Sequence, residues 1–172
     1  MKLEVLPGLL LPWYRENRRE LPWRQTSDPY RIWVSEIMLQ QTRVEAVRAY
    51  FDRWMAALPT VQALAAADTE LLYKLWEGLG YYSRVRNLKK AADIVVNDFG
   101  GFLPSDEKSL KSLPGIGDYT AGAIRSIAFG LPAAAVDGNV IRVFARFLNI
   151  DIVISDDKHK KELAKVLEKV SP

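Results

Sequence analysis

The 172-residue sequence contains no cysteine and a single histidine. The lack of thiols excludes disulfides, thiolate nucleophiles, zinc ribbons and cysteine-ligated iron–sulfur clusters built from these residues. His159 stands in a charged run, so we interpret it as a solvated helix residue rather than as part of a triad or a multi-histidine metal site. Any acid–base chemistry therefore falls to carboxylates, tyrosine or lysine.

Long apolar runs are also missing. Pro7 and Pro12 interrupt the short apolar segment near the N-terminus, and nothing approaches the roughly 20 apolar residues of a membrane span. We therefore expect a cytoplasmic protein without a membrane partner. The formal net charge of +3 permits a nucleic-acid partner but does not require one.

Apolar residues recur at spacings of three and four along almost the whole chain, and strand-like alternation is confined to residues 150–154. The pattern predicts roughly ten short helices in an all-α globule of one or two small domains. Asp28 and Pro29 form a strong helix start. Pro12 is expected to start or kink the first helix, and Ser105 to cap the helix before a Pro-Gly-Ile-Gly turn.

That turn, within residues 113–117, has glycines on both sides of one apolar residue. Glycines there permit close backbone approach and positive φ. The second glycine opens a helix whose first N–H groups are unpaired, an arrangement that suits a phosphate. An ordinary tight turn between two packed helices remains the alternative, because short glycine patterns are common.

Two carboxylates stand in different surroundings. Glu36 lies among apolar residues, where desolvation would raise its pKa, or else on the wet face of an amphipathic helix. Asp137 precedes Gly138 at a helix start, where it acts either as a simple N-cap or as an electrostatic partner for a cation. One protonated and one ionised carboxyl is the arrangement that glycosidic-bond cleavage needs.

Five segments carry a resemblance that extends in order along roughly residues 9–170. They are 21–24, 33–42, 75–82, 113–122 and 136–142. Together they resemble the adenine DNA glycosylase (MutY) family, a branch of the helix-hairpin-helix DNA glycosylase superfamily. The resemblance implies the all-α helix-hairpin-helix glycosylase fold, with a six-helix barrel domain and part of a second helical domain. It implies these ranges: 1–26 in the second domain, 27–135 as the six-helix domain with the hairpin at about 106–129, and 136–172 returning to the second domain.

The resemblance also implies a base-excision-repair activity at the bacterial nucleoid: hydrolysis of the N-glycosidic bond of adenine mispaired with 8-oxoguanine or guanine. Glu36 matches the general acid and Asp137 the carboxylate that stabilises the oxocarbenium ion. Tyr119 and Asn139 match residues that support this chemistry. Superfamily members that cut the strand carry lysine at the position of Tyr119, so we expect a monofunctional glycosylase.

Further site residues follow from the same resemblance. Gln41 and Tyr81 match residues inserted into the duplex around the target pair. The other expected DNA contacts are Thr42, Leu113, Gly115, Ile116, Gly117, Tyr119 and Thr120. The expected wall of the adenine pocket is Arg19, Leu21, Trp23, Arg24 and Leu39, although core packing is an equal alternative for Trp23. Carbonyls of Lys111, Leu113 and Ile116 are expected to hold Na⁺ or K⁺, and no side chain is expected to hold a metal.

The sequence departs from the family at its end. The family's four-cysteine [4Fe–4S] site and its C-terminal domain lie beyond Pro172, so we expect no cluster on these residues. We expect a monomer that binds mismatched double-stranded DNA with weakened affinity, poor 8-oxoguanine selectivity and a steep salt dependence. Two other hypotheses stay open: a thymine mismatch glycosylase on the same scaffold, and a catalytically inactive module that only binds DNA.

Overall fold

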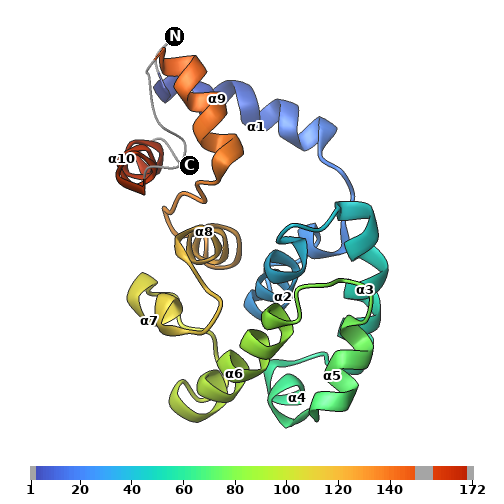
Figure 1. The fold of residues 1–172 in the computed structure, drawn as a ribbon. Helices are drawn as coiled ribbons and strands as arrows, with labels where there is room; N and C mark the ends of the chain where they lie inside the picture. The colour runs from blue at the N-terminus through green and yellow to red at the C-terminus, as the bar shows by residue number, and fades with distance from the viewer. Residues whose placement is uncertain (1–2, 150–156, 170–172) are drawn as a thin grey trace.

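A computed structural model describes residues 3–149 and 157–169, and every regular element among them is helical (Figure 1). The predicted all-α class is confirmed, whereas the strand-like residues 150–154 lie outside the described residues. The elements are η1 (Leu3–Val5), α1 (Leu6–Asn17), η2 (Pro22–Arg24), α2 (Pro29–Leu39), α3 (Val44–Ala57), α4 (Val61–Ala66), α5 (Thr69–Trp76), α6 (Ser83–Asp98), α7 (Glu107–Ser112), α8 (Asp118–Ala123), η3 (Ile124–Ala128), α9 (Gly138–Leu148) and α10 (Asp157–Glu168). Two of these, η1 and η2, are 3₁₀ turns, and η3 continues α8 as a π-helical turn.

One hydrophobic core joins α2 to α8. Trp33, Trp54 and Trp76 are fully buried in it, and the rings of Trp54 and Trp76 meet edge to face at 5.5 Å between centroids. Edge-to-face packing is a favoured geometry of aromatic pairs. The apolar spacing in the sequence predicts this core correctly, because the residues at intervals of three and four on α3 and α6 are the ones that are buried.

Side-chain caps fix where five of the described helices begin: α2, α4, α5, α7 and α9. Asp28 accepts hydrogen bonds from the backbone N–H groups of Tyr30 (2.8 Å) and Arg31 (3.3 Å), which confirms the predicted start of α2. The prediction that Ser105 caps α7 is wrong. Asp106 is the cap, because its carboxylate accepts from the N–H of Ser109 at 2.9 Å, three residues along.

The prediction that Pro12 starts the first helix is also wrong, whereas a kink at Pro12 stays a prediction. This proline lies inside α1, which begins after Val5 with Pro7 in its first turn. A proline in a helix interior removes one backbone hydrogen bond. The carbonyl that Pro12 leaves without this bond is that of Gly8, which is exposed to solvent on α1 and can be hydrated. A continuous helix is therefore tolerated there.

The helices gather into two regions (Figure 1). The first contains α2 to α8, whereas α1, α9 and α10 are seen at the other end of the molecule, away from α4 and α5. The core begins at Leu21 and also contains Trp23, so these two residues pack with the first region. The division into ranges 1–26, 27–135 and 136–172 stays a prediction.

Close contact at Gly122 brings the chain before α9 against α8. A Cβ atom at this position would lie 2.5 Å from the main-chain oxygen of Ala134. Because backbone atoms cannot move aside as a flexible side chain can, only glycine fits there without a shift. Gly122 thereby sets the distance between α8 and the segment that leads into Asp137.

We predict that Gly122→Ala destabilises the protein by about 1–3 kcal/mol, because overpacking forces the backbone apart. Urea unfolding would measure the change. Gly8→Ala on α1 is the control: nothing lies within 4 Å of a Cβ atom there. Alanine in a helix is favoured over glycine by roughly 0.5–1 kcal/mol, so the control should be neutral or stabilising. A Gly122→Ala protein as stable as the parent would contradict the prediction.

Candidate active site

Glu36 lies on α2, a helix that the core largely encloses. Seven of the eleven residues of α2 are buried, and Glu36 itself is half-buried. Burial raises the pKa of the Glu36 carboxyl, while a hydrogen bond with Tyr119 and the positive charge of Arg24 act in the opposite direction. The buried interpretation of Glu36 is therefore the correct one. Its carboxyl keeps a proton to higher pH than an ordinary glutamate and is suited to donate it.

Tyr119 stands in the first turn of α8 and reaches back to α2. Burial raises the pKa of Tyr119 to about 12, and the negative charges of Glu36 and Asp137 add to the shift. The phenol is therefore neutral near physiological pH and keeps its proton for the hydrogen bond with Glu36. Tyr119 lies close to both candidate carboxylates.

Asp137 is the N-cap of α9. Its Oδ1 accepts hydrogen bonds from the backbone N–H groups of Asn139 (2.9 Å) and Val140 (2.8 Å). The side-chain amide of Asn139 donates to Oδ2 at 3.1 Å. The capping interpretation is correct, and it is compatible with an electrostatic role because the carboxylate is held in one orientation beside Tyr119.

Three separate elements thus bring one constellation together. Glu36 comes from α2, Tyr119 from α8, and Asp137 with Asn139 from the start of α9. A carboxyl with a raised pKa faces a neutral phenol, and a second, fixed carboxylate lies nearby. This arrangement can protonate a leaving group and stabilise a cation formed next to it.

The turn between α7 and α8 has the predicted hairpin form. Gly115 adopts a φ of 84°, and a Cβ atom there would lie 3.0 Å from that of Asn87 on α6. The expectation of positive φ and close approach on both sides of Ile116 is wrong for Gly117, whose φ is −97° and which has nothing within 4 Å of a Cβ atom. The N–H of Ile116 donates to the carbonyl of Leu113 at 3.1 Å. Leu113, Ile116 and Thr120 are buried, whereas the predicted DNA contacts that lie at the surface of the hairpin are Gly115, Gly117 and Tyr119.

The residues predicted to enter the duplex occupy the tips of two turns. Gln41, just after α2, has a φ of 56°, and Tyr81, just before α6, has a φ of 48°. Both side chains are exposed, Tyr81 by 63%. Thr42 follows Gln41 and is half-buried. Left-handed backbone at residues other than glycine is costly and gathers at functional sites.

The five residues predicted for an adenine pocket separate into two groups. Leu21 and Trp23 are core residues, and the Trp23 ring packs edge to face on Phe51 at 5.4 Å. Trp23 is therefore packed in the core, as the core-packing alternative predicts. Arg24 lies near enough to Glu36 to lower the pKa of that carboxyl, and Leu39 is half-buried at the end of α2. Arg19 is exposed and paired with Glu45 at 3.4 Å.

Sequence analysis overlooked one buried charge, Arg84 on α6. Only 7% of this residue is exposed, and its guanidinium connects the turn after α2 with the turn before α6. A sequence signal existed, because positions 84, 88, 91 and 95 are spaced as one helical stripe and the other three are apolar. An arginine on an apolar stripe needs buried partners, which main-chain carbonyls supply here. The acceptors are the carbonyls of Ile37, Met38, Gln40, Leu79 and Gly80 and the hydroxyl of Thr42.

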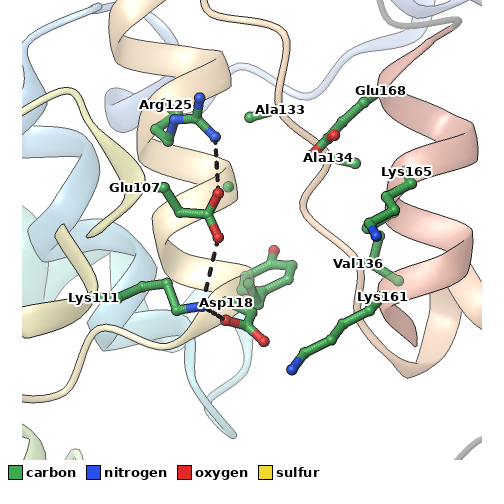
Figure 2. Close-up of a pocket in the computed structure, with 13 residues that line it drawn as sticks. Glu107, Lys111, Asp118, Arg125, Ala133, Ala134, Val136, Lys161, Lys165 and Glu168 are labelled. Carbon is green, nitrogen blue, oxygen red and sulfur yellow. Dashed lines mark hydrogen bonds and ion pairs between the residues drawn. The ribbon is translucent and has the colours of Figure 1, made fainter. Parts of the chain in front are cut away.

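A hollow of about 300 Å³ opens between the hairpin helices, the segment 133–136 and α10 (Figure 2). Lys111 forms ion pairs with Asp118 (2.5 Å) and Glu107 (3.5 Å) along its wall. Tyr119 lines the hollow, but neither candidate carboxylate does. The hollow therefore adjoins the Glu36–Asp137 constellation only through the tyrosine.

Neither a side-chain metal site nor a membrane-spanning helix is found among the described residues. No group of three or more His, Asp or Glu side chains there is placed to hold a metal ion. With no cysteine in the sequence, these residues do not fit the [4Fe–4S] cluster that the resemblance implies. His159, predicted to be solvated, is half-buried on α10. In residues 3–149 and 157–169, no helix is both long and apolar enough to span a bilayer.

A family model described as "HhH-GPD superfamily base excision DNA repair protein" matches residues 34–169. The chain belongs to this superfamily. Human adenine DNA glycosylase is 49% identical over 148 residues, 81% of this chain and 27% of that protein. The adenine DNA glycosylase of Buchnera aphidicola subsp. Acyrthosiphon pisum (strain APS) is 38% identical over 98% of this chain and 48% of its own length.

Solved structures agree with this assignment to the HhH-GPD superfamily. A thermostable thymine-DNA glycosylase superposes with a TM-score of 0.86 at 30% identity, over 99% of this chain and 78% of that one. The helix-hairpin-helix glycosylase fold predicted from the sequence is confirmed. The chain spans about half or less of the length of the curated relatives it matches.

The desolvation of Glu36 predicts a pH-dependent stability. Because the pKa of this carboxyl is raised on folding, the folded protein binds the proton more tightly than the unfolded chain does. The resulting stabilisation is present below the ordinary pKa of glutamate and is lost as pH rises through the raised pKa. Glu36→Gln stays neutral at every pH, so we expect it to be more stable than the parent near neutral pH.

This difference should shrink in acid, and urea unfolding at both pH values would measure it. Glu16→Gln at an exposed position of α1 is the matched control, expected to change stability by less than about 0.5 kcal/mol. Equal stabilities of parent and Glu36→Gln at neutral pH would show that Glu36 is not desolvated.

Proposed function

We propose that this chain is the catalytic core of a DNA glycosylase that releases adenine mispaired with 8-oxoguanine or guanine in double-stranded DNA. The constellation of Glu36, Tyr119 and Asp137 carries the proposal, because it places a proton donor and a fixed carboxylate together. The human and rat adenine DNA glycosylases, 49% and 50% identical to the chain, support the choice of base. Because every residue of the constellation comes from one chain, we propose that a monomer acts.

The proposed reaction is heterolysis of the bond between the adenine nitrogen and C1′ of the deoxyribose. Glu36 protonates a ring nitrogen of adenine, so that the electron pair of the breaking bond leaves on a neutral base. Asp137 stabilises the oxocarbenium ion left on the sugar. A water molecule then adds to C1′ and loses a proton, which leaves an abasic site. Tyr119 orients the carboxyl of Glu36, and Asn139 orients that of Asp137.

DNA is proposed to lie across the hairpin and the two strained turns. The N–H groups at the exposed Gly115 and Gly117 face a backbone phosphate. Gln41 and Tyr81 enter the duplex and replace the stacking that is lost when adenine is flipped out. An endonuclease III at 25% identity is solved as a DNA complex with a TM-score of 0.79.

A monovalent cation at the hairpin is part of the same proposal. The carbonyls of Lys111, Leu113 and Ile116 would hold Na⁺ or K⁺ beside the phosphate. The Leu113 carbonyl already accepts the N–H of Ile116, which leaves its second lone pair for a cation. The cation would screen the negative charge of the phosphate on the face opposite the N–H donors.

Thymine release is the second candidate. The similarity to a thermostable thymine-DNA glycosylase, with its TM-score of 0.86, favours it. Sequence identity favours adenine, since the thymine enzyme is 30% identical and the human adenine enzyme 49% identical. Duplexes with a G·T mismatch therefore belong beside those with adenine opposite 8-oxoguanine in the same assay.

We predict single-turnover release of adenine by the 172-residue chain from a duplex with adenine opposite 8-oxoguanine. Glu36→Gln should slow release by about 10²–10⁴-fold, the usual contribution of a general acid. Asp137→Asn should slow it by about 10²–10³-fold through the loss of charge stabilisation. Asparagine caps helices as well as aspartate does, so Asp137→Asn should unfold at the parent's temperature.

Two outcomes would overturn the proposed function. Thymine release from the G·T duplex without adenine release would select the second candidate. Tight binding of the mismatched duplex by parent and Glu36→Gln alike, with no base released by either, would identify a module that only binds DNA.

The proposed enzyme should leave the DNA strand intact, because Tyr119 has no amine to attack C1′. We predict uncut abasic product and no covalent complex when borohydride is added to the parent. Tyr119→Lys should gain such a complex, since its Nζ can displace water at C1′ to form an imine that borohydride reduces. Tyr119→Phe is the matched control without an amine. Strand cleavage by the parent would contradict the monofunctional assignment.

A further inference from the structure

Two exposed turns carry the residues proposed to enter the duplex, and each turn is strained at its tip. Gln41 and Tyr81 are 40 positions apart in the sequence, and both have a left-handed backbone that side chains other than glycine rarely adopt. Such conformations persist only where the surrounding contacts determine them. Buried atoms beneath the two turns must therefore hold Gln41 and Tyr81 in these conformations.

A single guanidinium lies beneath both turns. Nη1 of Arg84 donates to the carbonyls of Ile37 (3.1 Å), Met38 (3.0 Å) and Gln40 (2.6 Å). The hydroxyl of Thr42 lies 3.2 Å from the same nitrogen, so the two hydrogens of Nη1 are shared among acceptors on both sides of Gln41. Near the end of α2, the carbonyl of Ile37 accepts only one long backbone hydrogen bond, from the N–H of Gln40 at 3.4 Å, and Arg84 gives it a further donor.

The other nitrogen serves the second turn. Nη2 of Arg84 donates to the carbonyls of Leu79 (2.8 Å) and Gly80 (3.2 Å), the two residues before Tyr81. The guanidinium also lies 5.6 Å from the centre of the Tyr81 ring and 5.3 Å from that of Trp76. Trp76 itself donates from Nε1 to the Gly80 carbonyl at 3.0 Å, which ties this turn to the core.

The planar fork of arginine is what permits this double engagement. Its two terminal nitrogens are held at a fixed separation and angle, whereas a lysine ammonium is one point charge on a flexible stem. A shift of either turn would break bonds to the same rigid group. The two turns are therefore coupled through Arg84, in addition to the separate anchor that Trp76 gives the second turn.

We infer that Arg84 is the positioning residue that sets Gln41 and Tyr81 at a fixed spacing for entry into one duplex. This inference rests on the proposed DNA substrate, but it concerns base flipping and not the chemistry at Glu36. Arg84 touches neither DNA nor the reacting atoms in this role. Its effect passes entirely through the two turns.

Replacement of Arg84 tests the inference. Arg84→Met keeps an unbranched apolar stem and removes the guanidinium with its donors, and Arg84→Lys keeps the charge without the fork. Both should slow single-turnover adenine release by about 100-fold, the scale of a misplacement of about 1 Å. Affinity for undamaged duplex should change less than about threefold, since phosphate contacts supply most of it. Arg86→Met, at an exposed position of the same helix, is the matched control and should behave as the parent.

A variant that lacks both turn side chains distinguishes a positioning role of Arg84 from a role in the stability of the fold. In Gln41→Ala/Tyr81→Ala, the side chains that Arg84 would place are absent, so Arg84→Lys should slow release less than about threefold further. An equally large loss in both backgrounds would mean that Arg84 only maintains the fold. Parent-like rates for Arg84→Met and Arg84→Lys would also overturn the inference.

A readout without catalysis keeps this test apart from that of the proposed function. Duplex carrying 2-aminopurine in place of the target adenine becomes fluorescent when the base leaves the stack. The parent should raise this fluorescence, and Arg84→Lys should not, although both bind the duplex. Should the parent release no base, the fluorescence arm still decides the role of Arg84. An equal rise with parent and Arg84→Lys would refute it.

Discussion

The enclosure of α2 is the constraint on which the rest of the molecule depends. This helix contacts η2, α3, α6, α8 and η3, among them the helix that carries Tyr119 and the helix that carries Arg84. Its side chains are buried along seven of eleven positions, and Glu36 shares that environment. Water that would stabilise a carboxylate is excluded by the same packing that stabilises the fold. The raised pKa of Glu36 is thus a consequence of core formation.

Burial of this kind works against stability at neutral pH, which is a usual property of catalytic groups. The protein limits the effect with the hydrogen bond from Tyr119 and the charge of Arg24. Asp137 has different surroundings from Glu36. Three donors from the start of α9 face its oxygens, so its position is set by local capping and not by the core. Two carboxylates therefore acquire different chemistry from two kinds of surroundings.

Local signals in the sequence are sufficient to predict several helix starts and turns. Asp28 with Pro29 indicated the start of α2, and the glycines of the hairpin indicated a turn, because capping and positive φ depend on a few neighbouring residues. Glu36 remained ambiguous because its burial depends on α8, more than 80 residues further along. Arg84 escaped notice for the same reason: its acceptors lie on residues 37–42 and 79–80. Where the partners of a polar group are distant main-chain atoms, residue type alone cannot reveal them.

Backbone strain at Gln41 and Tyr81 follows from their place in exposed turns. A turn that must present a side chain to a partner cannot bury that side chain, so it has no packing of its own to fix its conformation. Gln41 and Tyr81 are in this position, each costing about 1–3 kcal/mol in an unfavourable backbone region. Arg84 lies beneath both turns and donates to the carbonyls of Gln40 and Leu79, and these hydrogen bonds offset part of that cost. Rigid support below and exposed side chains above allow a surface to be fixed before any partner arrives, which lowers the entropy cost of binding.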